Sequence, residues 1–254
     1  MRLVGVAWCV LMLTGAGTAA DRLPDGGIAT AGGTGPVEAW YGQPTTRYDH
    51  GILGDAIEAG ALVVTDAAGR RHEAVLPRRL VFEDITPRLV DLDGDGSSEI
   101  VTIRTDVAAG ASVAIYALSD GQLTERAVTA PIGLPHRWLS IAAIADFTAD
   151  PGLEIAVVKT PHIGGVLEIL SLQGRSLRTV RAPQSGYSTH VIGSRELSLA
   201  TAQHVSGDNF AKLALPTQDR MTLVVLEFEP GLRVVRTIAL ERPLQHPLDG
   251  LTEF

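Results

Sequence analysis

The chain has 254 residues, enough for one domain or two small ones. Its formal net charge is −8 and it contains no basic block, which gives no reason to expect a nucleic-acid partner. Cys9 is the single cysteine and lies near the N-terminus. The rest of the chain therefore excludes disulfides, thiolate metal sites and cysteine nucleophiles.

Residues 1–20 have the pattern of a secretory signal peptide. The basic residue Arg2 precedes an apolar run from Leu3 to Leu13, and small residues follow up to Ala20. This run is too short to span a bilayer, and no later stretch approaches the ~18 apolar residues that a spanning helix needs. We therefore expect a periplasmic or secreted protein, cleaved near Ala20, whose mature chain does not insert into a membrane.

The next stretch, residues 21–37, is rich in Gly, Ala, Thr and Pro and predicts a flexible leader. From residue 38 to residue 254, short apolar runs alternate with turn signals, and no long helical period interrupts them. The clearest runs are Ala61–Val64, Ile100–Ile103, Ser112–Tyr116, Glu154–Val158, Val166–Leu170 and Thr222–Leu226. Turns are predicted at Asp66–Gly69, Ser119–Gly121, Gln173–Gly174 and Glu229–Gly231. This pattern predicts an all-β domain, either a sandwich, a barrel or a propeller.

The strongest motif is the nine-residue segment DLDGDGSSE, from Asp91 to Glu99. Its alternate carboxylates and its turn glycine match a calcium loop, because Ca²⁺ prefers six to eight oxygen ligands. Four carboxylates so close together would repel one another without a cation. The expected ligands are the side chains of Asp91, Asp93, Asp95 and Glu99 and the carbonyl oxygen of Ser97. The alternative interpretation is an acidic surface turn that binds no metal.

The same pattern recurs further along the chain. Segment DFTADPGLE begins at Asp146, 55 residues after Asp91, and HVSGDNFAK begins at His204, 58 residues later. A weaker copy begins at Gly54. Each copy is followed by two apolar runs and a turn, so the repeat has the size of one four-stranded propeller blade.

The later copies have fewer ligands than the first. A weaker second site is predicted at Asp146, Thr148, Asp150 and Glu154, with a purely structural turn as the equal alternative because Pro151 replaces the glycine. In the third copy Lys212 replaces the glutamate. We expect its ammonium group to pair with Asp208 in place of a metal ion.

These repeats resemble the FG-GAP/VCBS family, over about residues 46 to 226. The segment RYDHGILGD, Arg47–Asp55, together with one good calcium loop, is also similar to small secreted bacterial VCBS-repeat proteins. The resemblance implies an integrin α N-terminal-like β-propeller, here of about four to five blades, that is exported and binds Ca²⁺. It implies no settled activity. Larger family members have more repeats, so closure of the ring stays open.

The residues just before each loop repeat predict a second site. In a propeller these segments begin the innermost strands, so their side chains converge at the channel mouth. The candidate ligand-binding residues are Tyr48, His50, Glu83, His136, Arg137, Trp138, Arg195 and Glu196. A polar ligand, either a glycan or a protein, is one interpretation. The favoured interpretation is a packing and ion-pair network between blades.

Catalytic signatures are missing from the sequence: it has no G-x-S-x-G, H-E-x-x-H or P-loop motif. The sequence therefore predicts an exported, monomeric, calcium-binding β-propeller that serves as a binding or scaffold module, with no catalytic residues assigned. The alternative is a calcium-dependent extracytoplasmic hydrolase that acts at the channel mouth.

Overall fold

The computed structural model describes residues 22–247, and these residues form seventeen strands and no helix. The strands fall into four consecutive groups, which we call units 1 to 4. Unit 1 contains β1 (Ala29–Thr30), β2 (Pro36–Thr45), β3 (Glu58–Asp66) and β4 (Arg71–Val75). Unit 2 contains β5 (Leu80–Phe82), β6 (Arg88–Val90), β7 (Glu99–Asp106), β8 (Gly110–Ser119) and β9 (Gln122–Val128). Unit 3 contains β10 (Leu139–Ala145), β11 (Glu154–Lys159), β12 (Val166–Gln173) and β13 (Ser176–Ser185), and unit 4 contains β14 (Thr201–Gln203), β15 (Lys212–Pro216), β16 (Thr222–Glu227) and β17 (Arg233–Ala239).

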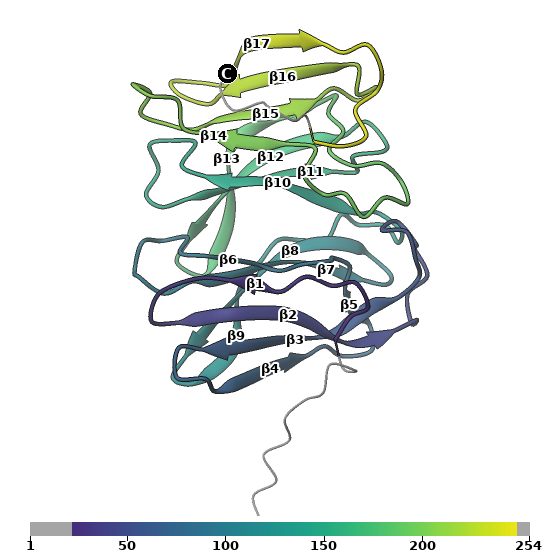
Figure 1. Ribbon diagram of the computed structural model, residues 1–254, viewed down its shortest axis with the longest axis vertical. Helices are drawn as coiled ribbons and strands as arrows, with labels where there is room; N and C mark the ends of the chain where they lie inside the picture. Colours follow the sequence, from purple (N-terminus) through teal and green to yellow (C-terminus); the bar gives the residue numbers. More distant parts are fainter. Residues whose placement is uncertain (1–21, 248–254) are drawn as a thin grey trace, which may run out of the picture.

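All strand pairs are antiparallel, and the units form a stack along the long axis of the molecule, with units 4 and 3 at one end and units 2 and 1 together at the other (Figure 1). Units 3 and 4 are separate four-stranded sheets, whereas units 1 and 2 share a nine-stranded sheet. The pair that joins them is Ala59 in β3 with Phe82 in β5. No sheet within residues 22–247 closes on itself. The predicted all-β class is confirmed.

The predicted strands and turns are also confirmed. All six apolar runs lie inside strands, and the four predicted turns connect β3 to β4, β8 to β9, β12 to β13 and β16 to β17. The central strands β7 and β11 are buried along almost their whole length. Neighbouring units cover both of their faces, which explains why their sequences are continuously apolar and not alternating.

The expected flexible leader is wrong for residues 22–37. Strand β1 pairs with β2, which already begins at Pro36, and Arg22 forms a bridge with Gly42. Leu23 is buried in the first apolar core. The segment is fixed because its backbone pairs along the edge of β2, a contact that its polar composition does not announce. The predicted signal peptide and its cleavage site lie outside the described residues. Within residues 22–247, no helix is both long and apolar enough to cross a membrane.

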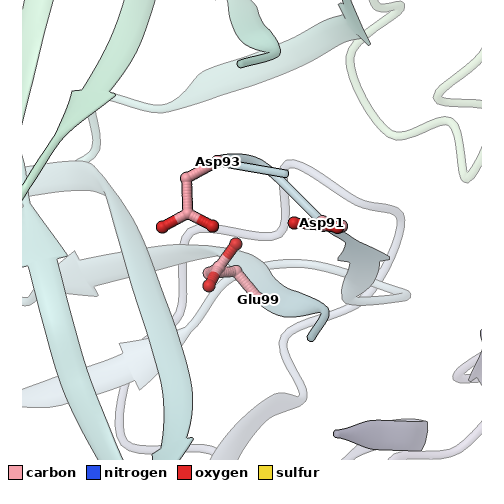
Figure 2. A group of neighbouring side chains, drawn as sticks. All are labelled: Asp91, Asp93 and Glu99. Atoms are coloured by element: carbon pink, nitrogen blue, oxygen red, sulfur yellow. The ribbon is translucent and has the colours of Figure 1, made fainter. Parts of the chain in front are cut away.

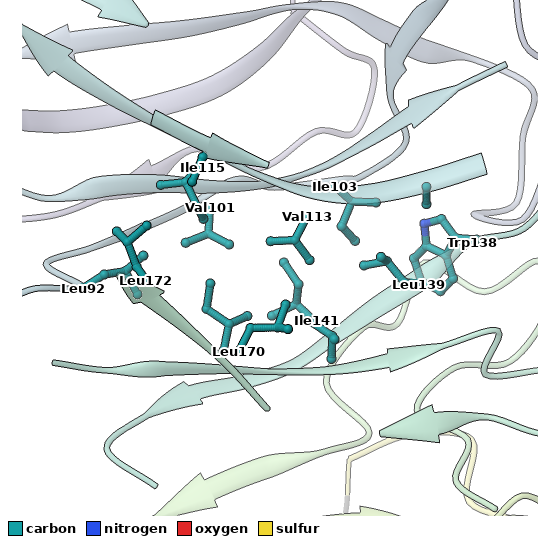
Figure 3. Packing of buried hydrophobic residues seen from close by; sticks show 14 of the residues in the cluster. Leu92, Val101, Ile103, Val113, Ile115, Trp138, Leu139, Ile141, Leu170 and Leu172 are labelled. Atoms are coloured by element: carbon teal, nitrogen blue, oxygen red, sulfur yellow. The ribbon is translucent and has the colours of Figure 1, made fainter. Parts of the chain in front are cut away.

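An apolar core fills each interface between consecutive units. Between units 2 and 3, Val101, Ile103 and Val113 face Leu139 and Ile141 (Figure 3). Between units 1 and 2 the rings of Tyr41 and Phe82 stack at 5.1 Å, and between units 3 and 4 Phe147 meets Phe228 at 5.2 Å. Each buried aliphatic or aromatic side chain stabilises the stack by about 1.5–3 kcal/mol.

Candidate functional site

The first loop, Asp91–Glu99, connects β6 to β7 and brings three of its four carboxylates together (Figure 2). One ligand oxygen from each of Asp91, Asp93 and Glu99 lies within 4.8 Å of the others. Oxygens bound to one Ca²⁺ at about 2.3–2.6 Å lie no more than about 5 Å apart. The spacing and the all-oxygen chemistry of this group therefore fit a calcium ion.

The backbone of the loop folds around Asp91. Its Oδ1 accepts hydrogen bonds from the N–H groups of Gly94 (2.8 Å) and Asp95 (3.1 Å), and its Oδ2 accepts one from Gly96 (2.8 Å). Gly94 and Gly96 both have positive φ, which glycine adopts without strain. The loop is therefore preformed by its own hydrogen bonds, as in other Asp-initiated turns.

Two of the predicted ligands, Asp95 and Ser97, make other contacts. Asp95 is outside the convergent group, and its Oδ1 accepts a hydrogen bond from the Ser97 N–H at 2.8 Å. The Ser97 hydroxyl lies against the Gly35 backbone, so Ser97 contacts unit 1. Whether its carbonyl oxygen binds a metal stays a prediction.

Glu99 is the most buried member of the group, with 2% of its surface exposed. Its Oε2 accepts a hydrogen bond from the Leu92 N–H at 2.9 Å. Burial raises the pKa of Glu99, and the charge of Asp93 raises it further, while the Leu92 N–H and Arg126 lower it. The acidic group therefore needs a positive charge close by.

Arg126 in β9 supplies such a charge, and the sequence interpretation missed it. Its guanidinium donates to Asp93 Oδ2 at 2.5 Å and to Glu99 Oε1 at 2.6 Å. The signal that could have found it is the repeat itself, because Arg181 occupies the same position 55 residues later. Both arginines lie on the outermost strand of their unit.

The second loop, Asp146–Glu154, has the same backbone plan but not the same acidic group. The Phe147 N–H donates to Glu154 Oε2 at 2.7 Å, which repeats the bond from Leu92 to Glu99. The other oxygen, Oε1, accepts from the Thr148 hydroxyl at 2.6 Å. Within the described residues, Asp146, Asp150 and Glu154 do not converge as a group of three. This geometry favours the structural-turn alternative.

The third loop, His204–Lys212, matches its prediction. Lys212 Nζ lies 2.5 Å from Asp208 Oδ2, so an ion pair stands where the first loop has only acidic groups. The loops are also tied together. The Leu153 N–H donates to the Leu92 carbonyl at 2.8 Å, and the Ala211 N–H donates to the Asp146 carbonyl at 2.7 Å. The three loops thus lie along one edge of the stack.

Five of the eight residues predicted at the channel mouth come together, and we call them the end cluster: Tyr48, His50, Glu83, His136 and Trp138. The hydroxyl of Tyr48 accepts a hydrogen bond from the His136 N–H at 2.9 Å, and the two rings stack at 5.2 Å. Nδ1 of His50 lies 2.5 Å from Glu83 Oε1. Trp138 Nε1 donates to the Glu83 carbonyl at 3.0 Å.

The other three predicted residues lie around this cluster without joining it. Arg137 donates to the neighbouring His136 carbonyl, and Arg195 donates to the Leu53 carbonyl and to Asp55, each at 3.1 Å. Glu196 accepts from the Ser198 N–H at 2.7 Å. Arg195 is thus a contact between the segment before unit 4 and the first repeat.

Two histidines that the sequence did not single out pack on the far side of Trp138. His162 Nε2 lies 3.0 Å from His190 Nδ1, and the His190 ring lies 4.8 Å from the Trp138 ring. Burial lowers the pKa of His162 to about 4, and the nearby His190, Arg220 and His50 add to the effect. Burial also lowers the pKa of His190 below its ordinary value, so burial favours the neutral form of both rings.

Burial divides the end cluster into two parts. Glu83 is completely buried and Trp138 is 2% exposed, and Trp138 belongs to the core between units 2 and 3. The side chains of His136 and Asp49 are 49% and 86% exposed, and His136 Nε2 lies 3.3 Å from Asp49 Oδ1. The inner part is therefore the packing network of the favoured interpretation, and only the outer part is accessible to a ligand.

Comparison with known proteins gave no family-model match and no match among curated proteins. The resemblance to FG-GAP/VCBS repeats stays a prediction that rests on the loop and repeat residues described above.

Proposed function

We propose that this chain is an exported calcium-binding protein of the β-propeller type that serves as a binding or scaffold module. The observation that carries the proposal is the convergence of Asp91, Asp93 and Glu99 on a preformed loop. The three carboxylates offer only hard oxygen donors, which favour Ca²⁺ over softer metals. The role of the ion would be to stabilise the first loop and, through it, the edge of the stack.

The repeated units support the propeller part of the proposal. Units 3 and 4 are each a four-stranded antiparallel sheet in sequential order, which is the composition of a propeller blade. Successive loops lie at one edge, and successive cores lie between facing sheets. The partner in this proposal is a protein or a glycan that contacts the exposed outer part of the end cluster, and the module acts as a monomer.

The position of the loop argues against the alternative of a calcium-dependent hydrolase. Two residues of the end cluster, His136 and Trp138, come just before β10, and the second loop comes just after it. The first loop is hydrogen-bonded to the second and therefore lies at the same end of β10. Strand β10 has seven residues, which corresponds to about 23 Å at ~3.3 Å per residue. An ion in the first loop would be too far from the end cluster to act on a ligand bound there.

The proposal predicts a calcium-dependent melting temperature. A ligand that binds only the folded protein stabilises it by about 2.7 kcal/mol at a hundredfold excess over its Kd. The melting temperature should therefore fall in chelator and recover with Ca²⁺ more than with Mg²⁺, which tolerates irregular sites poorly. Asp93→Ala should remove most of the response.

Asp150→Ala is the matched control, because it also removes one aspartate, but from a loop without an acidic group of three. It should keep the calcium response. Equal melting curves of the wild-type protein in chelator and in Ca²⁺ would contradict the proposal.

A further inference from the structure

Arg126 donates hydrogen bonds from three nitrogens, two of them to the first loop and one to unit 3. Two guanidinium nitrogens bind Asp93 and Glu99, and Nε donates to the Gly174 carbonyl at 3.2 Å. Gly174 belongs to the turn between β12 and β13, so the contact crosses from unit 2 to unit 3. The side chain of Arg126 is 22% exposed and that of Glu99 only 3%, which keeps the ion pair partly out of water. One side chain thus connects the acidic group to the next unit.

Arg126 binds the oxygen that the loop itself leaves free. Glu99 Oε2 is already bonded to the Leu92 N–H, and both oxygens of Asp91 are bonded to N–H groups of the loop. The remaining Glu99 oxygen, Oε1, is the one that accepts from Arg126. A divalent cation at this position would need the same oxygen and would be repelled by the guanidinium charge. A bound cation and the bound arginine therefore compete for this oxygen.

Arg181 shows which part of this arrangement belongs to the repeat. It lies in β13, 55 residues after Arg126, and its Nε donates at 3.0 Å to the Phe228 carbonyl, which follows β16 in unit 4. Its other nitrogens donate to Glu229 and to the Val180 carbonyl, not to the second loop. The bond to the next unit is therefore a repeated structural contact. Of the two arginines, only Arg126 also contacts an acidic loop.

We propose that Arg126 is a built-in competitor of the calcium ion in the first loop. It neutralises Asp93 and Glu99 when Ca²⁺ is scarce, sets the Ca²⁺ concentration at which the loop fills, and loosens its bond to Gly174 when the ion binds. Calcium binding is thereby coupled to the contact between units 2 and 3. This inference rests on the proposed calcium function.

The test is calorimetric titration of the purified protein with CaCl₂, for the wild type, Arg126→Gln and Arg181→Gln. Arg126→Gln should bind Ca²⁺ roughly tenfold more tightly, because one competing charge pair of about 1.4 kcal/mol is gone. In chelator it should melt below the wild type, since its carboxylates then repel one another. Arg181→Gln should keep the wild-type Kd within about twofold, because Arg181 shares no hydrogen-bond partner with the first loop.

A second measurement reads the coupling and does not depend on affinity. In the wild type, hydrogen exchange of the β12–β13 turn should become faster when Ca²⁺ is added, and in Arg126→Gln it should be fast in both conditions. If Arg126→Gln does not fold, Arg126→Lys should show a smaller increase in affinity, because an ammonium group cannot bridge both carboxylates.

The outcomes separate this inference from the function on which it rests. Calcium binding by the wild type with an unchanged or weaker Kd in Arg126→Gln and Arg126→Lys would overturn the role of Arg126 and leave the calcium function intact. Absence of binding in every protein would overturn both.

Discussion

Glu58 in β3 is a buried carboxyl group beside other carboxylates at the junction of units 1 and 2. It is 2% exposed, and burial raises its pKa to about 9, with Glu83, Asp55 and Asp84 adding to the effect and Arg195 opposing it. The unfolded chain would titrate near the ordinary value of 4.5. Between these two values the folded state binds the extra proton, so the stability falls as the pH rises from about 4.5 to 9.

Glu58→Gln should therefore stabilise the protein at pH 8 and have little effect at pH 4, because glutamine resembles the protonated acid. The gain should approach a few kcal/mol, at ~1.4 kcal/mol for each unit of pKa difference that is crossed. Urea unfolding of both proteins at the two pH values measures it. An equal stability difference at pH 4 and pH 8 would show that Glu58 does not titrate as described.

Trp138 and Arg137 are adjacent in sequence but differ in what they contribute. Trp138→Ala should lower the free energy of unfolding by about 3–5 kcal/mol, because it empties part of a core and leaves the Glu83 carbonyl without its donor. Arg137→Ala should change it by only ~0–1 kcal/mol. Chemical denaturation gives both values. If Arg137→Ala lost binding to a protein or glycan at unchanged stability, Arg137 would be assigned a role in ligand binding.

Whether a contact could be predicted depended on how far apart its two residues lie in the sequence. The pair of Lys212 with Asp208 lies within one nine-residue loop, so the loop frame predicts it. Arg126 lies 27 residues after Glu99, and only the register of β7, β8 and β9 brings them together. Asp95 lies outside the group of three because the motif specifies only residue types, whereas a local hydrogen bond from the Ser97 N–H holds its carboxylate.

At the scale of the elements, the contact between the first and second loops depends on Gly152. This residue has φ of +90°, and a Cβ atom there would lie 2.2 Å from the Leu92 carbonyl oxygen. Gly96, in the first loop, has a similar φ of +88° but no heavy atom within 4 Å of its Cβ position. The two glycines therefore separate the cost of the backbone conformation from the cost of the close approach.

Gly152→Ala should destabilise the protein by roughly 2–4 kcal/mol, since strain and a clash with the neighbouring loop add. Gly96→Ala should cost only about 1–2 kcal/mol in chelator, from the strained φ alone. Thermal unfolding in chelator compares them without the contribution of metal. Equal losses would mean that the loops separate easily.

Strands with a long apolar run could be predicted from the sequence. Strands without such a run could not, because only their backbone pairing with a neighbour defines them. Runs such as Ile100–Ile103 identify central strands from composition alone. Strand β1 has two residues and no apolar run, so only its pairing with β2 defines it. In unit 2, β5 and β6 both pair with β7 and are separated by the segment Glu83–Pro87, in which Pro87 has no N–H to donate.

At the scale of the whole molecule, the units bury their apolar surface mainly against their neighbours, and Ile52 and Leu53 of unit 1 also join the core between units 2 and 3. Stability in such a stack is approximately a sum over interfaces. The repeat predicted about four to five units, and its offsets of 55 and 58 residues agree with the four units that residues 22–247 form. Whether a ring closes could not follow, because closure depends on small rotations between units that no single residue encodes.

The aromatic pair between units 3 and 4 tests this description. Phe228→Ala should cost about 3–5 kcal/mol, because Phe228 is fully buried against Phe147. Val235→Ala, at a 40% exposed position of the same unit, should cost less than about 0.5 kcal/mol. Combining Phe228→Ala with Phe147→Ala should cost less than the sum of the two, by roughly 0.5–1.5 kcal/mol. Strict additivity in denaturation experiments would contradict the contact.

The charge on the outermost strands bears on how the protein behaves when it is crowded. Strands β9, β13 and β17 are edge strands of their sheets, and the last two carry exposed arginines, Arg178 in β13 and Arg233 and Arg236 in β17. A free edge is a template on which another chain can add a strand, and bulky like charges oppose that addition. These exposed arginines of β13 and β17 thus oppose fibril growth from the sides of the stack.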